Sequence, residues 1–220
     1  MTEDGPGERR AWQGTVGVVV PGDWWVVPLE DDRARADAIA ALVDARSGAD
    51  DALRDLRRQL RAEVGAAARR AAFRGGWVLA FLLADVGGLP LTATMTGYRA
   101  PGSFADDLAV DRVRDVLRGS VAGSDGVVDE TVGRLGRVLR CVRRRQLSHP
   151  SASAPPLPVS CVLHVDYWAD PGDGAGLLHL AFTTPFVDLE DAFVELFDTV
   201  VATLHRDERL EDGDDHPVPS

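Results

Sequence analysis

The stretch LHLAFTTPFVDLEDAFVELFDTVVATLHR, residues 178–206, constrains the fold more than any other part of the chain. Apolar residues alternate with other residues up to Thr184, which predicts a strand with one buried face. Pro185 lacks an amide hydrogen, so it predicts the end of that strand. An apolar stripe at helical spacing then runs on to Arg206, which predicts a helix that covers a sheet.

Polar residues refine the prediction for this strand and helix. We expect Asp188 to cap the helix N-terminus, with Asp191 three residues later as in a capping box. His205 and Arg206 are expected to complement the negative end of the helix dipole. We interpret Thr183 and Thr184 as strand-end residues rather than nucleophiles, because no activating base is identifiable nearby in the sequence.

The same two periodicities recur along the rest of the chain. Runs that predict strands occupy residues 15–20, 24–28, 77–85, 89–99, 159–168 and 177–184. Apolar residues at helical spacing occupy residues 31–48, 50–76 and 104–118. Residues 127–147 fit a helical stripe as well as a strand, and their β-branched residues lead us to prefer the strand. This order predicts the α+β class, an antiparallel sheet with helices packed on it.

Composition along the chain predicts one folded unit with irregular ends. We expect residues 1–12 to be a flexible N-terminus and residues 13–206 to form a single α+β domain. The Pro- and Ser-rich segment 148–158 is too poor in apolar residues for a core and is predicted to be a linker. The acidic residues 207–220 are predicted to be disordered.

Charge and hydropathy exclude several classes of protein. A formal net charge of −11 argues against a nucleic-acid-binding protein, which needs a basic face to neutralise phosphates. The chain begins without an apolar signal segment and has no long apolar run, so we expect a cytoplasmic protein without membrane insertion. The two cysteines, Cys141 and Cys161, suggest neither a disulfide framework nor a zinc motif.

Three segments carry a resemblance to known proteins: PGDWWVVPL, VDYWADPG and LAFTTPFVDLEDAFVELFDTVVATL. Together they resemble a group of actinobacterial proteins of unknown function, some of which are linked to type VII secretion loci. The whole arrangement is similar to the PsbP-like superfamily, in which an opening strand and a closing strand–helix unit frame an antiparallel α/β/α sandwich. The helix expected at 104–118 departs from its simplest form. The resemblance implies a binding or adaptor protein rather than an enzyme.

Two adjacent strands could bring an acid and a histidine together. If 159–168 pairs with 177–184, Asp166 and His179 become neighbours, which would suit either a general base or a common surface ion pair. We expect no metal site, because Cys161 and His164 are three residues apart and face opposite sides of a strand. The PGDGAG run joins two strands instead of opening a helix, so no cofactor phosphate is expected there.

Two arginine-rich sets are candidate surfaces for a partner protein: Arg54, Arg57, Arg58 and Arg61, and Arg140, Arg143, Arg144 and Arg145. They could dock an acidic partner, or they could pair locally, the first set with Asp50, Asp51 and Asp55. Our leading hypothesis is a non-catalytic adaptor or chaperone that binds another protein in protein secretion. The alternatives are an immunity-type inhibitor of a toxin, and a small-ligand protein or enzyme with a deep pocket around Asp166 and His179.

Overall fold

The computed structural model describes residues 8–47, 53–122, 125–147 and 160–206. The predicted linker at 148–158 and the predicted tail at 207–220 lie outside the described residues. Among the residues that the structure describes, no helix combines the length and the apolar character needed to span a membrane.

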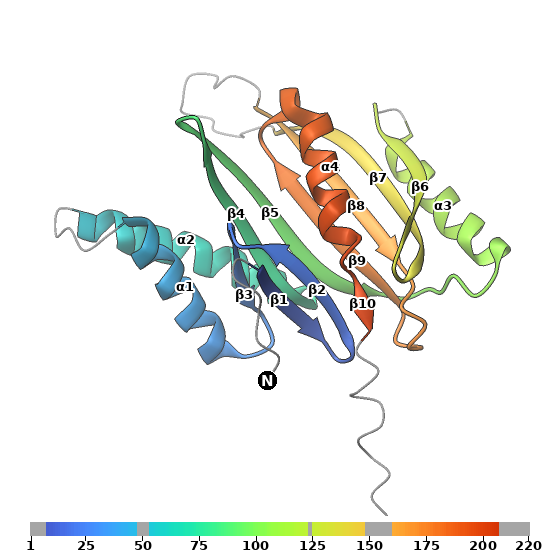
Figure 1. Cartoon of the computed structure of the whole chain (residues 1–220), viewed down its shortest axis with the longest axis horizontal. Coiled ribbons are helices and arrows are strands. Elements are labelled where there is room, and N and C mark those ends of the chain that lie inside the picture. The colour runs from blue at the N-terminus through green and yellow to red at the C-terminus, as the bar shows by residue number, and fades with distance from the viewer. Residues whose placement is uncertain (1–7, 48–52, 123–124, 148–159, 207–220) are drawn as a thin grey trace, which may run out of the picture.

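The described strands form two antiparallel sheets (Figure 1). The larger has seven strands in the order β3-β4-β5-β9-β8-β7-β6: β3 (Trp24–Pro28), β4 (Gly76–Val86), β5 (Leu89–Ala100), β9 (Leu177–Thr184), β8 (Ser160–Ala169), β7 (Gly136–Leu147) and β6 (Val127–Gly133). The smaller has the order β1-β2-β10: β1 (Glu8–Gln13), β2 (Val16–Pro21) and β10 (His205–Arg206). With helices packed on these sheets, the predicted α+β class is confirmed.

Helices lie on both faces of the large sheet. The described helices are α1 (Asp32–Ser47), α2 (Arg54–Phe73), α3 (Asp107–Val121) and α4 (Glu190–Val201). One face, which we call the α4 face, packs against α4 and the small sheet. The other we call the flanked face: α1 and α2 pack on its β3–β4 end, and α3 packs on its β6–β7 end.

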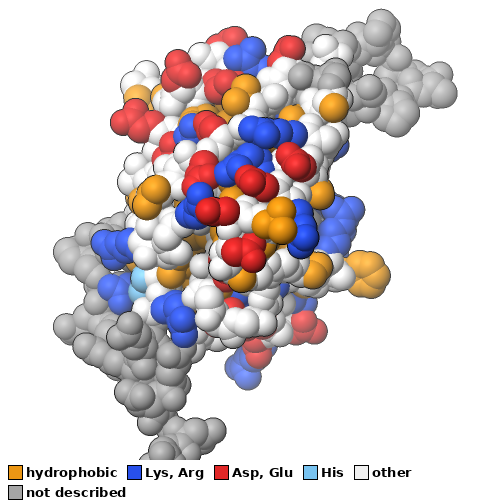
Figure 2. Space-filling view, turned by 90° about the vertical axis from the view of Figure 1, so that its right-hand side faces the viewer, with side chains coloured by type: hydrophobic (Ala, Val, Ile, Leu, Met, Phe, Trp, Pro, Cys, Tyr) orange, Lys and Arg blue, Asp and Glu red, His pale blue; other side chains and the backbone are white. Residues whose placement is uncertain are grey.

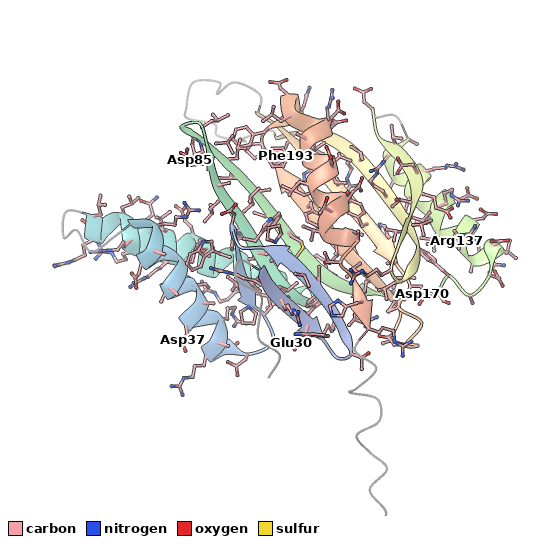
Figure 3. All side chains as sticks on the ribbon, viewed as in Figure 1. Glu30, Asp37, Asp85, Arg137, Asp170 and Phe193 are labelled. Atoms are coloured by element: carbon pink, nitrogen blue, oxygen red, sulfur yellow. The ribbon has the colours of Figure 1, made fainter. Side chains whose placement is uncertain are left out.

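The main core lies on the α4 face. Phe182 of β9 stacks on Phe197 of α4 with ring centroids 4.4 Å apart, and the Trp24 and Tyr167 rings meet Phe182 edge-on. Phe193 projects from α4 (Figure 3) and is also buried. Full burial of each such side chain stabilises the fold by about 1.5–3 kcal/mol. The predicted helical stripe over a sheet is therefore confirmed.

The corner between β9 and α4 differs from its prediction in detail. β9 ends at Thr184, directly before Pro185, as predicted. The predicted cap at Asp188 is wrong, because a 3₁₀ turn, Val187–Leu189, comes between strand and helix, and Leu189 precedes α4 without a side-chain cap. Thr184 holds the corner instead: its hydroxyl donates to the Thr92 carbonyl at 2.9 Å and accepts from the Phe186 N–H at 3.3 Å.

Both ends of the described fold also differ from the predictions. Residues 8–12 are not a flexible terminus, because Glu8–Gln13 forms β1 and pairs with β2. The last helix ends at Val201 rather than at Arg206, and His205 pairs with Gly17 of β2. The small sheet therefore closes the α4 face with residues from both ends of the described fold.

The ambiguous segment 127–147 is strand, as preferred, but it forms two strands. β6 and β7 pair from Val127 and Val142 down to Gly133 and Gly136. Gly136 has a φ of 90°, which a side chain rarely adopts, so the turn needs a glycine there. The hairpin places β6 at the outer edge of the large sheet.

Candidate functional site

Asp166 and His179 meet on the flanked face, as the strand pairing predicts. Trp168 is the direct cross-strand partner of His179, and Asp166 lies one step diagonally away. His179 Nε2 lies 2.8 Å from Asp166 Oδ1. The carboxylate therefore orients the imidazole, which is the geometry of a general base and equally of a structural ion pair.

Two aromatic rings enclose the imidazole of His179. The Trp168 ring stacks on it with centroids 4.0 Å apart and an interplanar angle of 3°, and Tyr98 of β5 stacks on it at 5.7 Å. Only 19% of the His179 side chain is exposed. This row of three rings crosses β8, β9 and β5 and holds the imidazole in one orientation.

Asp166 is shared between an arginine and a histidine. Arg143 Nη2 donates to Asp166 Oδ2 at 2.7 Å, while Oδ1 faces His179. The carboxylate is only 10% exposed, so this arginine balances a charge that would otherwise be costly to bury. A ligand pocket around Asp166 and His179 is what the enzyme hypothesis requires. Five hollows on the surface of the described residues have neither residue in their lining.

His164 adds a second imidazole to the same face. Its Nδ1 lies 3.2 Å from the Thr183 hydroxyl on β9. Burial lowers the pKa of His164, Arg143 and Arg145 lower it further, and Asp166 opposes them. Although His164, Asp166 and His179 face the same way, the described residues contain no group of three or more His, Cys, Asp or Glu side chains that could hold a metal ion.

The second arginine set does not form one surface, because it lies on a strand. Successive side chains of β7 point to opposite faces, so Arg140 and Arg144 lie on the α4 face and Arg143 and Arg145 on the flanked face. Arg144 Nε donates to Glu190 of α4 at 2.7 Å, and this bond raises the pKa of Arg144. Arg145 is exposed.

Arg140 ties the edge strand to α4. Its Nε and Nη2 donate to the two carboxylate oxygens of Asp129 on β6 at 3.0 and 2.6 Å, and its Nη1 donates to Asp198 of α4. The bonds to Asp129 are the main reason that the pKa of Arg140 is raised. Tyr167 donates its hydroxyl to Asp198 at 2.7 Å, and burial raises the pKa of Tyr167. Arg140 is thus a bridge within the fold.

The first arginine set lies on α2 and is also engaged within the protein. Arg58 pairs with Asp55 at 2.7 Å, which confirms the local pairing expected there, and Arg61 pairs with Asp44 of α1 at 2.5 Å. The other two members, which also have an interaction partner, are Arg54 and Arg57. Asp50 and Asp51 lie outside the described residues.

The glycine-rich loop between β8 and β9 is built around two aspartates. Asp170, labelled in Figure 3, accepts from the Phe104 N–H at 2.6 Å and from the Gly172 N–H at 2.7 Å. Arg99 donates two hydrogen bonds to the carboxylate of Asp173. Burial acts to raise the pKa of Asp173, but the hydrogen bonds from Arg99 and from the Ala175 N–H outweigh burial, so the pKa is lowered. Asp170 and Asp173 thus accept hydrogen bonds from the backbone N–H groups of Phe104, Gly172 and Ala175.

A surface that the sequence predictions captured only in part lies where β6 faces α4. One hollow of about 410 Å³ is lined by Val127, Val142 and Val194, and also by three arginines of the second candidate set: Arg140, Arg143 and Arg144. A second, of about 290 Å³, is lined by Thr131 and Val201 among others. A helix and a strand about 60 residues apart in sequence form both hollows, so no local sequence pattern indicates them.

The comparisons with known proteins add no identification. No protein-family model matches this chain, and neither a curated protein nor a solved structure matches it. The resemblance to the PsbP-like superfamily therefore stays a prediction.

Proposed function

We propose that this protein is a non-catalytic adaptor or chaperone that binds another protein in the cytoplasm, in the context of protein secretion. The single observation that carries the proposal is the edge strand β6 with two hollows beside it. An edge strand offers backbone donors and acceptors to a second chain, and hollows beside it can receive side chains.

The exposed apolar side chains of β6 support the same proposal. Val127 is 57% exposed and Val132 is 79% exposed, although both residues belong to a strand of the main sheet. The candidate arginines support it less, because most of them are already bound to carboxylates of this chain. Arg145 is exposed, as a residue that contacts a partner must be.

Co-purification with crosslinking from the native host tests this proposal. The tagged full chain should retain a defined second protein through washing, and the crosslinked band should contain both. A tagged chain that elutes alone and forms no crosslinked band would contradict the proposal. Recovery of a toxin as the sole partner would favour the immunity hypothesis instead.

A further inference from the structure

We propose that β6 binds an extended, basic segment of the partner protein as an added strand, and that side chains of this segment enter the two hollows beside α4. The inference rests on the proposed function and names the surface and the chemistry of the partner.

The backbone of β6 is available on one side. β6 pairs with β7 along Val127–Gly133, and no described strand pairs with its other side. In an antiparallel pair, alternate residues direct their N–H and C=O groups away from the neighbour. An extended peptide can therefore continue the ladder over the length of β6.

The spacing of the hollows fits a strand. The first hollow includes Val127 and the second includes Thr131, four residues further along β6. Four residues of strand span about 13 Å, and side chains at i and i+4 point to the same face. A peptide paired with β6 would place two side chains, four residues apart, over the two hollows.

The lining of the second hollow selects a long basic side chain. Both hollows have apolar parts, from Val142 and Val194 in the first and from Val138 and Val201 in the second. In the first hollow, the acids Asp125, Glu190 and Asp191 are balanced by three arginines, Arg140, Arg143 and Arg144. The second hollow is lined by Glu195 and Asp198 and by no arginine or lysine. An aliphatic stem can lie on the valines while its cationic head reaches the acids. Glu195 is the exposed acid in the second hollow.

The charges on β6 itself do not block the edge. Asp129 is held by Arg140, and Glu130 is held by Arg137 of β7 at 2.8 Å and by Arg114 of α3. The bond from Arg137 is the main reason that the pKa of Glu130 is lowered. Figure 2 shows the side of the molecule that carries α3, where acidic and basic side chains intermix.

A basic partner segment suits this surface better than a second copy of the chain. Each copy carries a formal net charge of −11, so two copies repel each other at long range. The same charge attracts a basic segment and speeds its association at low salt.

The test uses the full chain and three labelled peptides in fluorescence anisotropy. The peptide TRTVTRT places arginines four residues apart, and TETVTET replaces them with acids. The third peptide is TRTVTRT with N-methyl groups on the amides that would donate hydrogen bonds to β6. We expect TRTVTRT to bind about tenfold or more tighter than either control. Hydrogen exchange of the complex should be slowed in residues 127–133.

Charge reversal on α4 supplies the variant arm. Glu195→Arg should weaken TRTVTRT binding by about tenfold, while Glu63→Arg on α2, also exposed, should leave it unchanged at moderate salt. Equal binding of all three peptides, no binding up to about 1 mM, or protection confined to other strands would overturn the inference. If a native partner is retained equally by the wild type and Glu195→Arg, the proposed function stands and strand addition at this site fails.

Discussion

Replacing Arg140 with glutamine separates a structural arginine from a partner-binding one. The guanidinium bonds both oxygens of Asp129 and one of Asp198, and its side chain is 20% exposed. Hydrogen bonds to charged groups contribute about 1.5–3 kcal/mol when buried and less than about 1 kcal/mol when exposed. Because the ion pairs of Arg140 with Asp129 and Asp198 are partly exposed, we expect Arg140→Gln to lower the free energy of unfolding by about 2 kcal/mol. This loss corresponds to a decrease in Tm of roughly 4–8 °C.

Arg145→Gln is the matched control, because Arg145 lies on the same strand but is exposed on the flanked face. Its free energy of unfolding should stay within about 0.5 kcal/mol of wild type in urea titrations. Adding Asp198→Asn to Arg140→Gln should cost less than the sum of the single changes, since the two side chains share a bond. Equal losses for Arg140→Gln and Arg145→Gln would refute this reasoning.

Two further predictions concern packing and pH. An added Cβ at Gly97 would lie 2.6 Å from the Trp77 ring, so Gly97→Ala should lower the free energy of unfolding in urea by about 1–3 kcal/mol. An added Cβ at Gly119 in α3 meets open space, so Gly119→Ala should raise the free energy of unfolding by up to about 1 kcal/mol. Similar effects of the two substitutions would contradict this reasoning. Burial lowers the pKa of His164 below its usual 6.5, so the folded state favours the neutral ring. Its contribution to stability is present above about pH 6.5 and is lost as the pH falls through the folded-state pKa. His164→Gln should therefore flatten the stability profile between about pH 7 and pH 5 in thermal melts, and an unchanged slope would refute the assignment.

The elements that the sequence predicts correctly are those with a strong local period. The run ending at Thr184, the proline after it and the apolar stripe of α4 are all readable without knowledge of the rest of the chain. The same holds for α2 and for the two long hairpins. The approach of Asp166 to His179 follows from strand pairing alone.

The elements that sequence misses depend on distant partners. β1 reads ERRAWQ, in which Ala11 is buried and most other residues are polar, so only its pairing with β2 makes it a strand. β10 follows the helix too closely to show a period of its own. The cap expected at Asp188 fails because the chain makes a 3₁₀ turn there before α4 begins.

The site predictions show the same limit. The arginines at 140–145 are neighbours in sequence, and the strand period of two, applied to them, would already divide them between two faces. Their carboxylate partners, such as Asp198 and Glu190, come from an element about 50 residues away and are not readable from local sequence. That residues 13–206 form a single domain stays a prediction.

Site-specific photo-crosslinking in the native host tests the central claim most directly. A photoreactive residue at Val132, which is 79% exposed on β6, should form an adduct with a partner protein through a basic extended segment. The same residue at Phe73, 92% exposed at the end of α2, is the control and should form little adduct with that protein. An adduct at Val132 that is absent at Phe73 is the predicted result. Adducts at Phe73 alone, or none at either position, would contradict the account.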